Sequence, residues 1–326
     1  MGQRWCAEGA DLMSLRMIEP ETIDDAAFVS STVPETDAPV WDVSTDYPFS
    51  DPDNPEEVIV EEGQHAIYRA VAPSGPSHGG AVDPATDTGN TKWVKIRSTN
   101  RWRVFDEYIG DPSVQANSAQ WVITAPNVID SVALFGLYAL SVTVLVRDSG
   151  GAEVYNQTYS LQDENSVVDL YTYLTSPIIL SDRLVITDIP PYAGAKVTVT
   201  AEASGEDIEV GQIVIGRKEE LGVTIDEIPL SIQDFSRKER DPDFGRVSLL
   251  EKDFADEMPV AFVFPTSRAS YLKSRLASRR AKLTVYSSDG PYKANEFSVY
   301  GFYQSFQVVP RIGIESEGIL ELESIT

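Results

Sequence analysis

Apolar and polar residues alternate with a period of two through most of the segment from Trp102 to Arg217, a pattern typical of β-strands with one buried face. The expected strands are WVIT, SVALFGL, LSVTVLVRD, EVYNQTYSL, RLVITDI, KVTVTAEA and VGQIVIG. In the third of these, Val142, Val144 and Val146 share one face, opposite Ser141, Thr143 and Leu145. Turn signals such as DSGG and ASGED separate the strands. This spacing predicts an antiparallel, jelly-roll-like β-sandwich, with a hairpin closed by the DSGG turn at residues 148–151.

A smaller β-rich unit is expected before the sandwich. EVIVEEG and HAIYRAVAP predict two strands around a Glu-Gly turn, and KWVKI predicts a third. Five prolines, at positions 34, 39, 48, 52 and 55, exclude a central strand from the preceding loop. Further upstream, Thr22 stands three residues before Asp25, which predicts a short capped helix from near Ile23.

The C-terminal part is expected to combine strands with one helix. SRASYLKSRLASRRA places Ala269, Leu272, Leu276 and Ala277 on one helical face, and Ser267 precedes it as a candidate cap. TVYSS, FSVYGFYQSFQVV and GILELESI predict closing strands. The whole chain is therefore expected to be mainly β, with a small three-stranded module, an antiparallel sandwich and a C-terminal α+β or β unit. The expected divisions are an N-terminal arm (1–31), the small module (32–97), the sandwich (98–218) and a C-terminal docking unit (219–326).

The charge of the chain limits its partners. Its 26 basic and 51 acidic residues give a net charge of −25 over 326 residues. Up to Thr91 there are 18 acidic and 3 basic residues, which gives −15 for that part alone. Such a surface repels phosphate backbones and anionic lipid headgroups, so nucleic acid is not an expected partner.

One cluster of residues is basic, although the chain as a whole is acidic. The polar face of the expected helix carries Arg268, Lys273, Arg275, Arg279 and Arg280. On so acidic a chain, these side chains are expected to pair with an acidic surface of the same or a neighbouring subunit, and they are our candidate interface residues.

The sequence offers no catalytic constellation. Residues 75–79 (GPSHG) match the nucleophile-elbow pattern but lack the strand-to-helix context that it requires. Cys6 is the one cysteine, so neither a disulfide nor a thiolate metal cage is expected. Asp51, Asp53, Asn54, Glu56 and Glu57 offer oxygen ligands for calcium without the EF-hand spacing. We expect a non-enzyme with no catalytic residue, no metal-ligating residue and no cofactor, with calcium as an open alternative, and no segment is apolar enough to span a membrane.

Several phrases, taken in order, resemble tailed-bacteriophage virion proteins of the tail that carry a carbohydrate-binding region. They are RMIEPETIDDAAFVSSTVPETDAPVWDVSTDYP, a Tyr-Arg-Ala strand, KWVKIRSTNRWRVFD, GQIVIGRKEELGVTIDEIPLSIQDFSRKERDPDFG and YGFYQSF. TNRWRVFD and DFSRKERDPDFG are the most specific pieces. The resemblance runs from Met17 to the end, which implies that residues 1–16 are an extension that the fold does not need.

Part of this resemblance concerns sugar binding. VWDVSTDYP, the Tyr-Arg-Ala strand and KWV are similar to the small chitin- and cellulose-binding module of bacterial glycoside hydrolases. The resemblance implies a platform formed by Trp41, Tyr47, Tyr68 and Trp93. Here SDPDNPEE replaces the usual Gly-Asp after the tyrosine, and the alternative is that Trp41 and Trp93 form the core of the module. The same two alternatives, contact with a sugar ligand or packing in a core, apply to Trp102, Arg103 and Phe105. For Trp102 we expect core packing.

The resemblance implies a structural protein of the phage particle, in the tail tip or baseplate, that docks on symmetric neighbours and contacts host surface glycan. Its expected partners are other tail proteins and copies of itself, and its expected location is the virion tail, after assembly in the host cytoplasm. The alternatives are a carbohydrate-binding receptor protein, a polysaccharide depolymerase, and a head-decoration or fibre-anchor protein. A depolymerase requires a cleft with two carboxylates at catalytic separation, one of them with a perturbed pKa.

Overall fold

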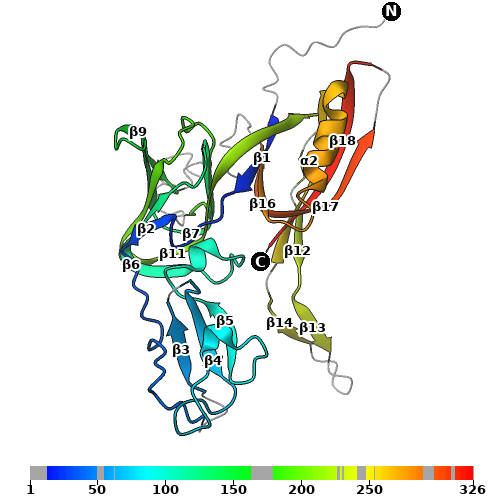
Figure 1. Cartoon of the computed structure of the whole chain (residues 1–326). Helices are drawn as coiled ribbons and strands as arrows, with labels where there is room; N and C mark the ends of the chain where they lie inside the picture. The colour runs from blue at the N-terminus through cyan, green and yellow to red at the C-terminus, as the bar shows by residue number, and fades with distance from the viewer. Residues whose placement is uncertain are drawn as a thin grey trace, which may run out of the picture.

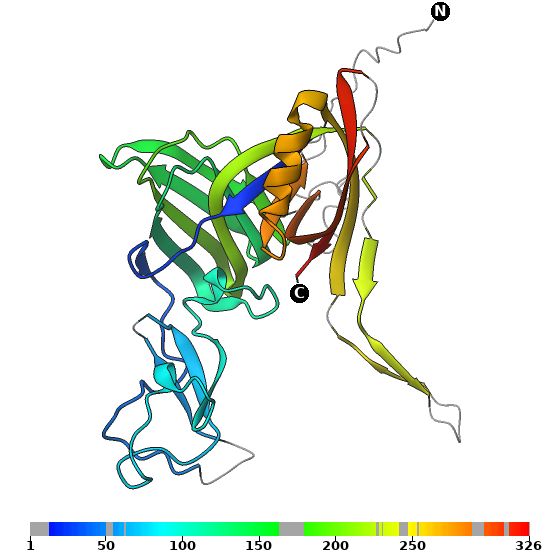
Figure 2. The same ribbon diagram turned by 45° about the vertical axis from the view of Figure 1, so that its right-hand side comes forward.

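The computed structural model describes residues 13–49, 55–61, 63–162, 179–225, 228–229, 231–240, 247–252, 254–288, 297–309 and 313–325. Within these residues the chain is mainly β with antiparallel sheets, a small three-stranded sheet and one α-helix, which confirms the expected fold class. Figures 1 and 2 show the sandwich, the C-terminal unit beside it, and two projections that extend from them.

The described strands form three sheets. The large sheet contains β1 (Ser14–Pro20), β2 (Phe28–Ser31), β6 (Ser113–Thr124), β7 (Ser131–Tyr138), β8 (Ser141–Arg147), β9 (Glu153–Ser160), β10 (Arg183–Ile186), β11 (Lys196–Thr224), β12 (Ser231–Asp234), β15 (Phe254–Pro265), β16 (Thr284–Ser288), β17 (Ser298–Val309) and β18 (Glu315–Ser324). The module contains β3 (Glu57–Val60), β4 (Ala66–Ala70) and β5 (Trp93–Ser98). A separate ribbon contains β13 (Arg237–Arg240) and β14 (Val247–Leu250). The helical segments are α2 (Ala269–Ala277) and the 3₁₀ turns η1 (Pro84–Thr86), η2 (Arg103–Phe105) and η3 (Thr266–Arg268).

The sandwich follows the predicted alternation closely. In β8 the three valines at 142, 144 and 146 are fully buried, while the residues between them are half-exposed. Asp148 closes the β8–β9 hairpin, because its N–H donates to Ala152 O at 2.9 Å and its carboxylate accepts from the N–H groups of Gly150 and Ala152. Trp121 and Ile123 of β6 pack in the same core. The predicted hairpin and strand faces are confirmed.

The strand β11 differs from the expectation. KVTVTAEA and VGQIVIG were expected as two strands around the turn ASGED, but they belong to one strand of 29 residues. The turn residues form an irregularity inside it, between Glu202 and Asp207, where Asn117 Oδ1 accepts the Gly205 N–H at 3.0 Å. Because β11 runs on to Thr224, the boundary expected at 218/219 falls within a strand that the sandwich and the C-terminal unit share.

The expectation of an N-terminal helix was wrong. The residues before Thr22 form β1, which pairs with both β11 and β16. Asp24 does accept local N–H groups, from Ala26 and Ala27, but it thereby makes a turn into β2. Residues 14–16, expected to be dispensable, are part of β1, and Leu15 is fully buried. A long-range pairing therefore overrides the local capping signal.

The C-terminal unit surrounds a second core. Its strands run in the order β11-β1-β16-β17-β18-β15, and β11 also pairs with β15 at Val223↔Val263. Leu272 and Leu276 of α2 are buried in this core, as the helical spacing predicted, whereas Ala277 is exposed. Ser267 lies in η3 and does not cap the helix, whose N-cap position is Arg268 and makes no side-chain cap. None of the described helices is long and apolar enough to cross a membrane.

The module is a small unit built around aromatic residues, in agreement with the three strands expected there. Trp93 lies at its centre and its indole N–H donates to Val82 O at 2.9 Å. The loop before β5 is organised by Asp87, which accepts the N–H groups of Thr91, Lys92 and Trp93. Burial alone would raise the pKa of Asp87, but these hydrogen bonds hold it at about 2.

Candidate functional site

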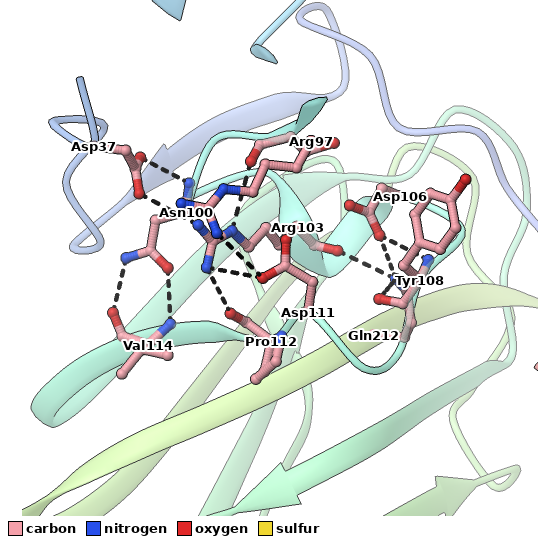
Figure 3. A network of polar contacts seen from close by, with 11 residues as sticks. Asp37, Arg97, Asn100, Arg103, Asp106, Tyr108, Asp111, Pro112, Val114 and Gln212 are labelled. Carbon is pink, nitrogen blue, oxygen red and sulfur yellow. Dashed lines mark hydrogen bonds and ion pairs between the residues drawn. The ribbon is translucent and has the colours of Figure 1, made fainter. Parts of the chain in front are cut away.

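The segment TNRWRVFD, one of the most specific phrases of the sequence, connects the module to the sandwich. It covers residues 99–106, between the end of β5 and the start of β6. Asn100 fixes the course of the chain, because its side chain both donates to Val114 O and accepts the Val114 N–H, each at 2.8 Å. Its own N–H donates to Asp37 Oδ2 at 2.9 Å. Figure 3 shows these contacts, which join the connector to the loop of the module and to β6.

Arg103 is the central cation of this junction. Its side chain is 9% exposed, and its two Nη atoms lie 3.2 Å from Asp111 Oδ1 and 3.5 Å from Asp37 Oδ1 (Figure 3). Nη1 also donates to Pro112 O at 3.2 Å. The guanidinium is therefore occupied by carboxylates and a carbonyl of its own chain, and it does not face outward as an anion-binding group.

A second cluster lies around His65. Its Nε2 is 2.6 Å from Asp25 Oδ1 and its Nδ1 is 3.0 Å from Glu35 Oε1. The same Glu35 oxygen accepts from Thr99 Oγ1 at 2.7 Å, and Glu35 Oε2 lies 3.4 Å from Arg101 Nη1. Both ring nitrogens of His65 therefore face carboxylate oxygens.

Trp102 completes this junction as a buried ring. It is 8% exposed, as the core expectation required, and it stacks on His65 with centroids 4.0 Å apart and planes 13° apart. Phe28 and Phe105 pack on it at centroid distances of 5.0 and 5.6 Å. The junction between module and sandwich therefore contains a cluster of packed rings, of which His65 and Trp102 are stacked, beside ion pairs.

A large cleft lies between the sandwich and the C-terminal unit. Its volume is about 1210 Å³. Its lining contains five acidic and two basic residues, which leaves an excess of three negative charges. The acidic residues are Glu19, Glu21, Asp106, Glu107 and Glu323, and the basic ones are Arg279 and Lys282. Phe105, Tyr108, Tyr300 and Phe302 add aromatic surface. The cleft is thus acidic and partly apolar.

Asp106 is a carboxylate of this cleft whose pKa lies well above its ordinary value. Burial raises the pKa of Asp106 to about 6, although its Oδ1 accepts from the Tyr108 N–H at 2.9 Å and from Gln212 Nε2 at 3.0 Å. Gln212 is fully buried and also donates to Arg103 O, so it holds the connector against β11 (Figure 3). Asp106 therefore combines a structural position with a pKa in the range of a general acid.

The wall that joins the C-terminal unit to the sandwich is mainly apolar. Phe135 of β7 stacks on Tyr300 of β17, with centroids 5.6 Å apart. Beside them Arg183 of β10 donates to Ser298 O at 2.8 Å and lies 2.9 Å from Asp256 Oδ2. Burial alone lowers the pKa of Arg183, but hydrogen bonds with Asp182 and Asp256 raise it above its usual value.

The aromatic residues expected to bind sugar are mostly inside the module. Tyr47, Tyr68 and Trp93 are buried, and Trp41 is half-buried. Tyr47 packs edge-on against Trp93 at a centroid distance of 5.1 Å, and its hydroxyl accepts the Asp42 N–H. The four rings do not form a flat exposed platform, because a unit this small uses its large rings as its core.

The five candidate interface residues, which lie in α2 or next to its ends, divide into two groups. Arg275 pairs with Glu219 at 2.8 Å and with Glu19, Arg279 pairs with Glu19, and Arg268 donates to Glu220 O at 2.8 Å. Lys273 and Arg280 are exposed. Three of the five thus contact an acidic surface of the same chain, formed by β1 and β11. We expected these residues to contact an acidic surface either of the same subunit or of a neighbouring one, and for these three the structure shows the first.

The remaining sequence features lie in loops. Residues 75–79 form a turn between Gly75 and Gly80 and not a strand-to-helix elbow. Of the calcium candidates, Asp51, Asp53 and Asn54 lie outside the described residues, and Glu57 pairs with Arg69 at 2.7 Å. In the part of the chain that the structure describes, no group of three or more His, Cys, Asp or Glu side chains is placed to hold a metal ion.

The chain was compared with protein-family models, with curated proteins and with solved structures, and none of the three comparisons found a match.

Proposed function

We propose that this chain is a structural component of a tailed-phage particle, in the tail tip or baseplate region, whose work is assembly. The observation that supports this proposal most is the distribution of the charged and apolar side chains. At the junctions the charged groups are satisfied by one another, as around Arg103 and His65. The projecting ribbon carries exposed apolar side chains, among them Leu249 and Leu250, which are 75% and 56% exposed.

The continuous sheet gives further support. A protein that holds neighbours in a fixed order needs its binding surfaces on one rigid frame, and β11 supplies that frame by crossing from the sandwich to the C-terminal unit. The module and the ribbon project from this frame at separate places (Figures 1 and 2). Copies arranged about an axis then contact one another repeatedly through the same projections.

The proposal is tested by measuring how much of the chain is present in gradient-purified particles of the phage that encodes it. Quantitative mass spectrometry is expected to find it in a fixed, small-integer ratio to the other tail proteins. A chain confined to the lysate supernatant would remove the assembly role. Host glycan contact is a separate part of the proposal, and binding of the purified chain to host-surface polysaccharide tests it.

A polysaccharide depolymerase is the second candidate, and Asp106 is the observation that favours it. Asp106 lies in the wall of a large acidic cleft and has a pKa of about 6, as a general acid of glycoside hydrolysis requires. Release of reducing ends from host polysaccharide by the wild-type chain, lost in Asp106→Asn, would support this candidate. No release by the wild-type chain would exclude it for that polysaccharide.

A further inference from the structure

Among the described strands, β13 and β14 pair with each other and with no strand of the large sheet or of the module. The ribbon that they form is a two-stranded sheet of its own, and all eight of its strand residues are exposed. In both Figure 1 and Figure 2 it extends away from the C-terminal unit. An isolated two-stranded ribbon is only marginally stable in water. Burial of its exposed leucines against another surface would therefore stabilise it.

The two faces of the ribbon differ. Directly opposed residues share a face, so the register places Arg237, Glu239, Ser248 and Leu250 on one face and Lys238, Arg240, Val247 and Leu249 on the other. On the first face Arg237 Nε lies 3.1 Å from Glu239 Oε1, which neutralises its charge. The second face, which we call the basic face, has two cations and two apolar side chains and no carboxylate among these four residues. Its complement is a surface with carboxylates and exposed apolar area.

The acidic cleft between the sandwich and the C-terminal unit has that character. Its excess of three negative charges remains after its own cations are counted. Glu19 is already paired with Arg279, but Glu107 is exposed at the cleft wall. Tyr108 beside it is 66% exposed and offers an aromatic surface to an aliphatic side chain.

We propose that the basic face of the ribbon of one copy docks into the acidic cleft of a second copy of the same chain. Lys238 and Arg240 then face carboxylates such as Glu107, and Val247 and Leu249 cover aromatic surface of the cleft wall. Ribbon and cleft are different surfaces, so the contact is heterologous and repeats from copy to copy, closing a ring or extending a filament. The inference deepens the proposed assembly role by identifying the two contacting surfaces, but its test needs only the purified chain.

Sedimentation velocity of the full chain over a range of concentrations tests the contact. The wild-type chain is expected to self-associate, and more weakly as salt rises, because cations and carboxylates at the edge of the contact are screened. Leu249→Ser is expected to weaken association about tenfold or more, as truncation of a central apolar contact does. Leu250→Ser is the matched control, because it removes the same side chain from the opposite face and should leave association unchanged.

Charge exchange identifies the partner surface. Lys238→Glu and Glu107→Lys are each expected to weaken association, and the chain that carries both substitutions is expected to recover it. Arg237→Glu is the control on the opposite face. All these residues are exposed, so unchanged circular dichroism and melting temperature will show that each variant folds.

Cysteine pairing locates the contact between copies. In a Cys6→Ser background, Lys238→Cys chains mixed with Glu107→Cys chains are expected to form a disulfide-linked heterodimer, and Arg237→Cys chains are not. A monomer at every concentration, or equal effects of Leu249→Ser and Leu250→Ser, would overturn the inference. So would glycan turnover in the cleft, which a docked ribbon excludes. A monomeric chain that is still present in the particle would defeat this inference and leave the proposed function standing.

Discussion

The module and the C-terminal unit are attached to the same sandwich in two different ways. The module has its own sheet and is held by side chains, through the ion pairs of Arg103 and the contacts of His65 and Glu35. The C-terminal unit shares β11 and β1 with the sandwich and adds an apolar contact between Phe135 and Tyr300. A shared sheet unfolds together, whereas a side-chain junction can be opened with the two units still folded.

The largest effect is expected at a crowded strand pairing of the shared sheet. A Cβ added at Gly216 would lie 2.0 Å from Glu19 O, at the pairing of β11 with β1. Gly216→Ala should therefore destabilise the sandwich and the C-terminal unit together, by about 3 kcal/mol. Denaturant unfolding followed by circular dichroism measures this, and Gly313→Ala, where nothing lies within 4 Å of the added Cβ, is the control. Separate transitions for the two units would contradict the shared-sheet account.

A smaller effect, confined to one junction, is expected from Arg103→Met. The substitution leaves Asp37 without this cation and Asp111 with the longer contact to Arg97 Nη1 at 4.0 Å, and since Asp111 is partly exposed we expect a loss of about 2 kcal/mol. Limited proteolysis should then cut the connector near residue 100 while the melting transition of the large sheet stays close to that of the wild type. Equal loss of protection in both regions would show that the module is not held independently.

The helix α2 tests the same distinction within the C-terminal unit. Arg275→Met removes the pairs with Glu219 and Glu19 and should cost about 1 kcal/mol. Lys273→Met, two residues away and exposed, should change the free energy of unfolding by less than about 0.5 kcal/mol. Chemical denaturation of both variants tests whether the ion pairs of Arg275 stabilise the chain. An equal loss in the free energy of unfolding for the two variants would show that they do not.

The smallest effect depends on pH. The pKa of Asp106 is about 6 in the folded chain and near 3.8 when unfolded, so between these values the unfolded state has released a proton that the folded state retains. Stability therefore falls as pH rises from about 4 to about 6. Asp106→Asn removes this penalty and should raise stability at pH 8 by about 0.5 to 1 kcal/mol after solvent screening, with no gain near pH 3.5. Thermal melts at both pH values check this, and an equal shift at both would exclude the ionisation as its cause.

The sequence predicted best what depends on short-range pattern. Alternating valines in β8, the DSGG hairpin and the buried leucines of α2 follow from periods of two and 3.6 and from turn chemistry. The failures have long-range causes. Thr22 and Asp25 look like a helix start, yet pairing of β1 with β11 and β16, some 200 residues away, decides the conformation before them. ASGED looks like a turn between two strands, but its residues form an irregularity within β11, where Asn117 Oδ1 accepts the Gly205 N–H.

The candidate site was predictable only in part. TNRWRVFD was singled out by sequence, and core packing of Trp102 was expected, but the carboxylates that surround Arg103 come from positions 37 and 111. Nothing local indicates those partners, nor the pairing of Arg279 with Glu19 across 260 residues. The exposed ribbon was also missed, since RKER was noted only as part of the phrase DFSRKERDPDFG and exposure is a property of the fold.

The central claim, that the chain is an assembly component of a phage tail, is tested most directly by cryo-electron microscopy of the tail of intact particles. The account predicts density for the sandwich and the C-terminal unit in several symmetry-related copies at the tail tip or baseplate, with the ribbon of each copy in the cleft of its neighbour. A tail reconstruction fully explained by other chains, with no density for this one, would contradict it.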